Sequence, residues 1–134
     1  LKPERTFAEK LMALDGDMRR GVEGAKDVPT RHYYDVAQLY AKHAGVRACV
    51  SSGGIRALVR DVAEVSNRHF GATIDVEHFD LRASPALNVS AEQAAILLPR
   101  YASSSEKPLY YRGQPPFEDI LRIVADIRQA LPPP

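Results

Sequence analysis

Apolar side chains recur every three or four residues along several stretches of the chain, which is the spacing of one face of an α-helix. The first stretch shows the pattern with Phe7, Leu11, Leu14 and Met18. The same periodicity continues in three further stretches, so four long helices are predicted. They cover residues 4–20, 31–44, 55–70 and 116–131.

Residues that typically begin or end helices separate these stretches. Thr30 stands where an N-cap is expected for the second helix, and Gly45 and Gly71 follow the second and third helices. A threonine hydroxyl can accept a hydrogen bond from a free N–H of the first turn, and glycine tolerates the backbone conformation that ends a helix. The helix boundaries are therefore predicted from caps as well as from apolar spacing.

Residues 46–50 could add a short helical segment. One further helix opens at Ser90, which forms a capping-box pattern with Gln93. Pro99 is expected to kink or end that helix. Residues 72–89 are predicted to be an extended loop. Part of this segment alternates as a β-strand does, but no partner strand is evident.

The chain is therefore predicted to be one all-α domain, a helical bundle of about five helices spanning residues 1–134. Its composition, 45% hydrophobic and 26% charged, is typical of a globular protein, and its net charge of +1 gives no sign of binding to nucleic acid or a membrane surface. No apolar run approaches the length of a membrane span. The single cysteine, Cys49, cannot form an intrachain disulfide, so the cytoplasm is the expected location.

Motifs for several common chemistries do not occur in the sequence. There is no glycine-rich phosphate loop, no CxxC and no HExxH. The four histidines have no ligand spacing, so no metal site is predicted. Cys49 has no base near it in the sequence and is expected to be a buried structural thiol.

Two charged residues stand out from the helical pattern. Lys10 lies at the edge of the apolar stripe of the first helix, where its stem can pack while its ammonium reaches a cleft. Asp35 lies nearly opposite the stripe of the second helix, on a face with Arg31, Gln38 and Lys42. An Arg31–Asp35 pair on a solvated face would contribute roughly a few tenths of a kcal/mol. Periodicity alone favours this surface interpretation of Asp35 over an active-site role.

Three motifs nevertheless resemble a known family. They are ERTFAEKLMAL at residues 4–14, RHYYDVAQL at residues 31–39 and PLYYRGQPPFEDIL at residues 108–121. In this combination they are similar to the C-terminal helical half of the AbiEii/AbiGii toxin family of nucleotidyltransferases. The family carries an R-T-F-x-E-K-x-x-A-L stretch followed by an R-[HD]-x-Y-D-[LV] stretch on successive helices. The resemblance spans nearly the whole chain, and it is the combination of motifs that is specific.

The resemblance implies an activity and a set of site residues. Family members transfer a nucleotide from a nucleoside triphosphate (NTP) to an acceptor, which is tRNA for some members. Several are toxins of bacterial toxin–antitoxin and phage-defence systems, so a cognate antitoxin is an expected partner. By motif position, Lys10 contacts the triphosphate and Asp35 is the catalytic residue that completes the active site. Arg5, Arg31 and His32 match motif positions that would support nucleotide binding.

One departure from the family pattern limits this expectation. Family members begin with an α/β domain that carries a Gly-Ser start and an Asp-x-Asp pair for metal ions, and no such segment precedes Lys10. Asp15 and Asp17 have the spacing but follow the lysine motif on a predicted helix. Because Leu1 is not an initiator residue, the chain is expected to be the C-terminal part of a longer protein. Mg²⁺ and NTP are then expected to bind the complete enzyme, and the chain alone is expected to be inactive.

Two other classes of function stay open at this point. The chain could be a non-catalytic helical interaction module that binds a partner protein and keeps the motifs as packing residues. It could also be a small nucleic-acid-binding domain, for which only Arg19 and Arg20 give local support. An upstream Asp-x-Asp segment in the same gene would favour the enzyme.

Overall fold

The computed structural model describes residues 2–21, 28–102 and 115–134. Within these ranges the chain forms α-helices and a short 3₁₀ helix, η2 (Leu81–Ala83), and no β-strand. The α-helices are α1 (Pro3–Arg20), α2 (Val28–Lys42), α3 (Ala44–Ser51), α4 (Ile55–His69), α5 (Ala91–Ala102) and α6 (Phe117–Ala130). The prediction of an all-α protein is confirmed.

The predicted number of helices was wrong, because the described residues form six α-helices rather than about five. The short segment expected at 46–50 is a full two-turn helix, α3. His43 has an extended backbone (φ −117°, ψ 108°) that separates α3 from α2. Val46 and Val50, one turn apart, are both fully buried. Burial of this face stabilises a helix that would be too short to form alone.

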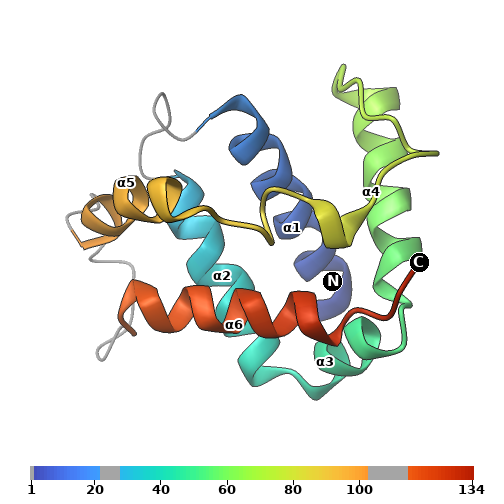
Figure 1. Ribbon diagram of the computed structural model, residues 1–134. Coiled ribbons are helices and arrows are strands. Elements are labelled where there is room, and N and C mark those ends of the chain that lie inside the picture. The colour runs from blue at the N-terminus through green and yellow to red at the C-terminus, as the bar shows by residue number, and fades with distance from the viewer. Residues whose placement is uncertain (1, 22–27, 103–114) are drawn as a thin grey trace.

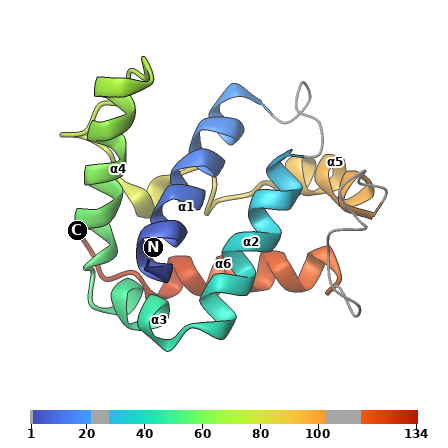
Figure 2. The same cartoon turned by 180° about the vertical axis from the view of Figure 1, so that it is seen from behind.

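The core is built around α1, which lies between α2 and α4 (Figures 1 and 2). The predicted stripe of α1 is buried, since Phe7, Leu11, Leu14 and Met18 are at most 3% exposed. On the other side of α2, the ring of Tyr33 meets the ring of Phe117 in α6 edge-to-face, with 6.1 Å between centroids. This packing holds α6 against the face of α2 that carries Tyr33.

Helix caps agree with the predictions in some places and differ in others. The capping box of α5 is confirmed, because Ser90 N–H donates to Gln93 Oε1 (2.9 Å) and Gln93 N–H donates to Ser90 Oγ (3.1 Å). The N-cap prediction for Thr30 was wrong, since α2 begins at Val28 and Thr30 is fully buried in its first turn. Pro99 does not end α5, which continues to Ala102.

The segment between α4 and α5 is extended only in part, because it also contains turns at 76–78 and 85–87 and the helix η2. It runs back across α1 (Figure 1). Asn67 fixes its start, donating from Nδ2 to Ile74 O and accepting from Ile74 N–H at Oδ1, both at 2.9 Å. Further along, Tyr33 Oη donates to Ala86 O (2.8 Å), which ties the segment to α2. The segment is therefore an ordered cover over α1 and α2.

Part of the third family motif, residues 108–121, lies outside the described residues, as does most of the loop that precedes it. In the described part of the chain, no helix combines the length and apolar character needed to cross a membrane.

Candidate functional site

Lys10 and Asp35, which the family resemblance singled out, meet across the boundary between α1 and α2. Lys10 Nζ lies 3.2 Å from Asp35 Oδ2, and the two side chains are 33% and 29% exposed. Lys10 lies between Phe7 and Leu14 on α1, so its stem packs beside the buried stripe. The ring of Phe7 stacks on Tyr40 of α2 with 6.3 Å between centroids, which holds the two helices close together. Asp35 is therefore partly enclosed by α1 and is not a fully solvated charge.

A second contact between polar side chains crosses the same boundary further along the two helices. Asp17 Oδ2 of α1 lies 3.2 Å from His32 Nδ1 of α2, and these side chains are 14% and 19% exposed. Asp17 Oδ1 accepts from the Arg20 guanidinium (2.5 Å). Sequence analysis named His32 and missed Asp17 as its partner. A helical wheel could have given a signal, because Asp17 lies seven residues after Lys10 and so on the same side of α1.

We call the four side chains Lys10, Asp17, His32 and Asp35 the α1–α2 rim. Arg31 precedes His32 on an exposed part of α2. Arg5 does not join the rim, because it lies on the opposite flank of α1. It pairs there with Asp61 of α4 and, at 3.5 Å, with Glu9. The hydrogen bond to Asp61 raises the pKa of the Arg5 guanidinium above its ordinary value.

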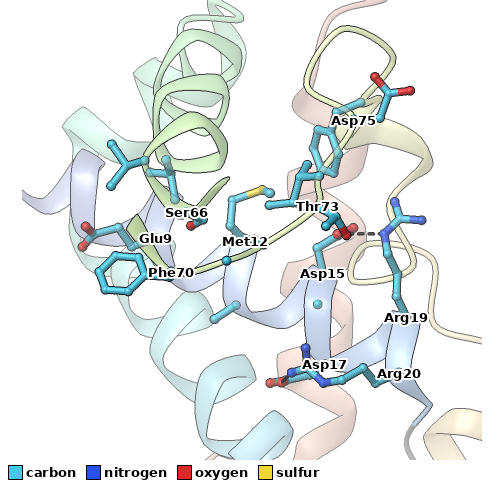
Figure 3. Close-up of a pocket in the computed structure, with 18 of the residues that line it drawn as sticks. Glu9, Met12, Asp15, Asp17, Arg19, Arg20, Ser66, Phe70, Thr73 and Asp75 are labelled. Carbon is cyan, nitrogen blue, oxygen red and sulfur yellow. Dashed lines mark hydrogen bonds and ion pairs between the residues drawn. The ribbon is translucent and has the colours of Figure 1, made fainter. Parts of the chain in front are cut away.

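An open pocket of about 1020 Å³ lies on the Arg5 side of α1, between α1, the end of α4 and the segment that follows it (Figure 3). Neither Lys10 nor Asp35 lines it. Its acidic lining residues are Glu9, Asp15, Asp17, Asp75 and Asp80, and its basic ones are Arg5, Arg19, Arg20 and His78. Carboxylates outnumber arginines in this lining, so its charge does not favour binding of a triphosphate. The first family motif contributes Arg5 and Glu9 to the lining, but nothing in the sequence indicated a pocket there.

Asp15 and Asp17 do not form the metal-binding pair that their spacing resembles. Both line this pocket, but every one of their carboxylate oxygens has a protein partner. Asp15, only 4% exposed, accepts from Ser84 Oγ at 2.6 Å and from Arg19 Nε at 2.8 Å, while Asp17 is bound by Arg20 and His32. Among the described residues, no group of three or more His, Cys, Asp or Glu side chains could hold a metal ion. The donor set of this Asp-x-Asp therefore does not fit Mg²⁺.

Cys49 is half-buried rather than fully buried. Burial raises the pKa of its thiol above the ordinary value, and the carboxylate of Glu4 adds to this effect. A raised pKa disfavours the reactive thiolate. This agrees with the expectation of a structural thiol.

A comparison with protein families identifies one match over most of the chain. The family model described as Nucleotidyl transferase AbiEii toxin, Type IV TA system, matches residues 1–123 of the 134 residues. This match is to the same family that the motifs around Lys10 and Asp35 resemble. Searches of curated proteins and of solved structures gave no match.

Proposed function

Because the chain belongs to the AbiEii nucleotidyl transferase toxin family, whose description places it in type IV toxin–antitoxin systems, we propose that it is the C-terminal helical domain of a nucleotidyltransferase. The complete enzyme transfers a nucleotide from an NTP to an acceptor such as tRNA. The observation that carries this proposal is the Lys10–Asp35 pair, since two motifs from successive helices deliver their charged residues to one place, 3.2 Å apart.

Lys10 is the triphosphate-binding residue of this proposal. An ammonium is a compact cation that binds phosphate oxygens, and its stem is held here beside the buried face of α1. Asp35 keeps that ammonium at the rim in the absence of nucleotide. When a triphosphate binds, its oxygens replace the carboxylate as the partner of Lys10, and Asp35 becomes available to another group.

Asp35 is the catalytic residue of this proposal. Transfer forms a bond between the acceptor oxygen and the α-phosphorus of the NTP and releases pyrophosphate. A carboxylate that accepts a hydrogen bond from the attacking hydroxyl orients that hydroxyl for the displacement. Arg31 and His32 lie on the same helix within one turn of Asp35 and support nucleotide binding. Arg5 gains no support for such a role, because it is engaged with Asp61 on the other flank of α1.

The metal ions of nucleotidyl transfer need carboxylates from outside this helical domain. Asp15 and Asp17 are fully engaged with protein partners, so they do not fit the role. In the complete enzyme, Mg²⁺ stabilises charge on the transferring phosphoryl group. The helical domain supplies the cation and the orienting carboxylate, and a cognate antitoxin counteracts the complete toxin.

The test compares the 134-residue chain with the same chain as part of its full-length gene product. Each is incubated with labelled NTPs, Mg²⁺ and total tRNA. The full-length protein is expected to label an acceptor, and Lys10→Ala or Asp35→Asn to abolish that labelling. Lys2→Ala and Asp126→Asn are matched controls, because both side chains are exposed and lie outside the family motifs.

Two outcomes would contradict the proposal. Labelling by the 134-residue chain alone would show that no further carboxylates are needed. Undiminished labelling by full-length Asp35→Asn would return Asp35 to the role of a surface charge, and would favour the helical interaction module instead.

A further inference from the structure

The α1–α2 rim contains a cross-helix pair that the family motifs do not explain. Asp17 follows Lys10 by seven residues, about 10 Å along α1, and His32 precedes Asp35 by three residues, about 4.5 Å along α2. The two pairs therefore lie next to each other in the same boundary. The Asp17–His32 pair is the more buried one, with side chains 14% and 19% exposed.

Asp17 determines which nitrogen of His32 carries a proton. An ionised carboxylate can only accept hydrogen bonds, so the contact at 3.2 Å requires hydrogen on Nδ1. The other carboxylate oxygen accepts from Arg20 at 2.5 Å, which fixes the orientation of Asp17 and stabilises its charge.

The second ring nitrogen of His32 is left for a ligand. Nε2 has no hydrogen-bond partner among the described residues. The buried polar atoms without a partner in these ranges do not include Nε2, so this nitrogen reaches solvent. It belongs to a ring held one turn from Asp35. A doubly protonated imidazole at this place would donate from Nδ1 to Asp17 and from Nε2 to an anion.

We propose that Asp17 is a positioning residue that keeps a proton on Nδ1 of His32, so that His32 meets a phosphate group of the nucleotide as an imidazolium donating from Nε2. This inference rests on the proposed function, because the phosphate is that of the NTP bound by Lys10. The neutral ring presents only a lone pair at Nε2, so phosphate binding at this position takes up a proton.

The charged groups around His32 allow this coupling. From α1 they are Asp17 and Arg20 at the ring, and Lys10 further along the helix. From α2 they are Arg31 and Asp35. α5 and α6 also pack on α2, and α6 does so at the buried face that carries Tyr33. Within the rim, Asp17 is the carboxylate in direct contact with the ring.

Asp17→Asn is a sharp test because it keeps the shape of the side chain. The Arg20 guanidinium can only donate, so in this variant it binds the oxygen of the new side-chain amide. The N–H₂ group of that amide then faces His32 Nδ1. Nδ1 then accepts, and the single proton of the neutral ring moves to Nε2, as in the Asp-to-Asn change of the serine protease triad. The neutral ring of this variant can donate to phosphate without taking up a proton.

The first measurement is the tautomer of His32, read from ¹⁵N NMR spectra of the 134-residue chain above the titration range of histidine. His32→Gln assigns the signals. The wild-type ring is expected to be protonated on Nδ1 and the Asp17→Asn ring on Nε2. His78, whose Nδ1 lies 2.9 Å from Asp75 Oδ2, is an internal reference that should not change. An Nε2-protonated wild-type ring, or an unchanged tautomer in Asp17→Asn, would overturn the proposal.

The second measurement is calorimetric binding of inorganic tripolyphosphate to the same chain at about pH 6 and about pH 8. Between these pH values the wild-type affinity is expected to fall up to about tenfold more than that of Asp17→Asn, because only the wild-type ring needs a second proton to donate to phosphate. The change in charge of tripolyphosphate itself is common to both proteins, and Asp75→Asn should behave as the wild type. Equal pH dependence in wild type and Asp17→Asn would overturn the role of Asp17.

The two proposals fail in different ways. If Lys10→Ala leaves tripolyphosphate affinity unchanged at both pH values, the proposed nucleotide site is wrong, and the phosphate role of His32 is wrong with it. If Lys10→Ala abolishes binding but tripolyphosphate does not shift the His32 signals, the nucleotide site stands and the inference about Asp17 and His32 is refuted.

Discussion

The side chains of Lys10 in α1 and Asp35 in α2 form an ion pair across the two helices, with 3.2 Å between Lys10 Nζ and Asp35 Oδ2. The pair joins the two motifs on which the family resemblance depends. Both side chains are about one-third exposed, so the pair is accessible at the surface while its stems pack against the core.

The Lys10–Asp35 pair should contribute little to folding. Because each side chain is about one-third exposed, solvent screens the interaction, and the coupling energy should be below about 1 kcal/mol. A double-mutant cycle of Lys10→Ala and Asp35→Asn, measured by urea unfolding of the 134-residue chain, gives this value. If either single variant lowered the free energy of unfolding by more than about 2 kcal/mol, the pair would have a structural role.

The buried hydrogen bond between Ser84 and Asp15 should be important for stability. Ser84 Oγ donates to Asp15 Oδ1 at 2.6 Å and accepts from Ala86 N–H at 3.1 Å. Ser84→Ala leaves a buried carboxylate oxygen without this donor, so the free energy of unfolding should fall by about 1–3 kcal/mol. Ser51→Ala is the control, because Ser51 Oγ bonds only Ala48 O in an exposed turn. Equal urea midpoints for the two variants would contradict the role of Ser84.

Stability should decrease at alkaline pH because of Tyr33. Burial, with a smaller effect from Asp17, raises the pKa of Tyr33 far above its ordinary value of 10.0. Above about pH 10 the unfolded chain releases the phenolic proton while the folded chain keeps it. The folded state then binds more protons, so the free energy of unfolding falls as pH rises. Tyr33→Phe should show a smaller decline between about pH 9 and about pH 11 in urea unfolding. An identical decline would refute this assignment.

The thiol of Cys49 should react slowly with iodoacetamide. Burial and, to a smaller extent, Glu4 raise its pKa, so the thiolate fraction near neutral pH is reduced. Mass spectrometry should show slower alkylation of the folded chain than of the urea-unfolded chain. Glu4→Gln should increase the folded rate by less than about threefold, because burial is the larger cause. A folded rate equal to the unfolded rate would exclude this protection.

The sequence predicted the long helices well because their buried stripes have a clear period. Phe7, Leu11, Leu14 and Met18 are all buried as expected. Thr30 illustrates what a local pattern misses. Its side chain is suited to an N-cap, but α2 begins at Val28 and Thr30 is packed inside its first turn. Packing against neighbouring helices therefore determined this boundary rather than local propensity.

The site was predictable in part. The motifs indicated Lys10 and Asp35, and the structure brings them together. Arg5 was grouped with Lys10 by motif position, and neither the motif nor a wheel of one helix shows that it faces α4. The Asp17–His32 contact depends on the register between α1 and α2, which packing sets. A wheel of α1 places Asp17 on the side of Lys10, but it does not contain the register that pairs Asp17 with His32.

The most direct test of the account is single-turnover nucleotide transfer by the full-length protein at saturating NTP. Asp35→Asn should retain NTP binding and lose transfer by about a hundredfold or more, because it removes the orientation of the attacking hydroxyl. Asp126→Asn should transfer at the wild-type rate. Transfer by Asp35→Asn at the wild-type rate would show that the carboxylate beside Lys10 has no part in the reaction.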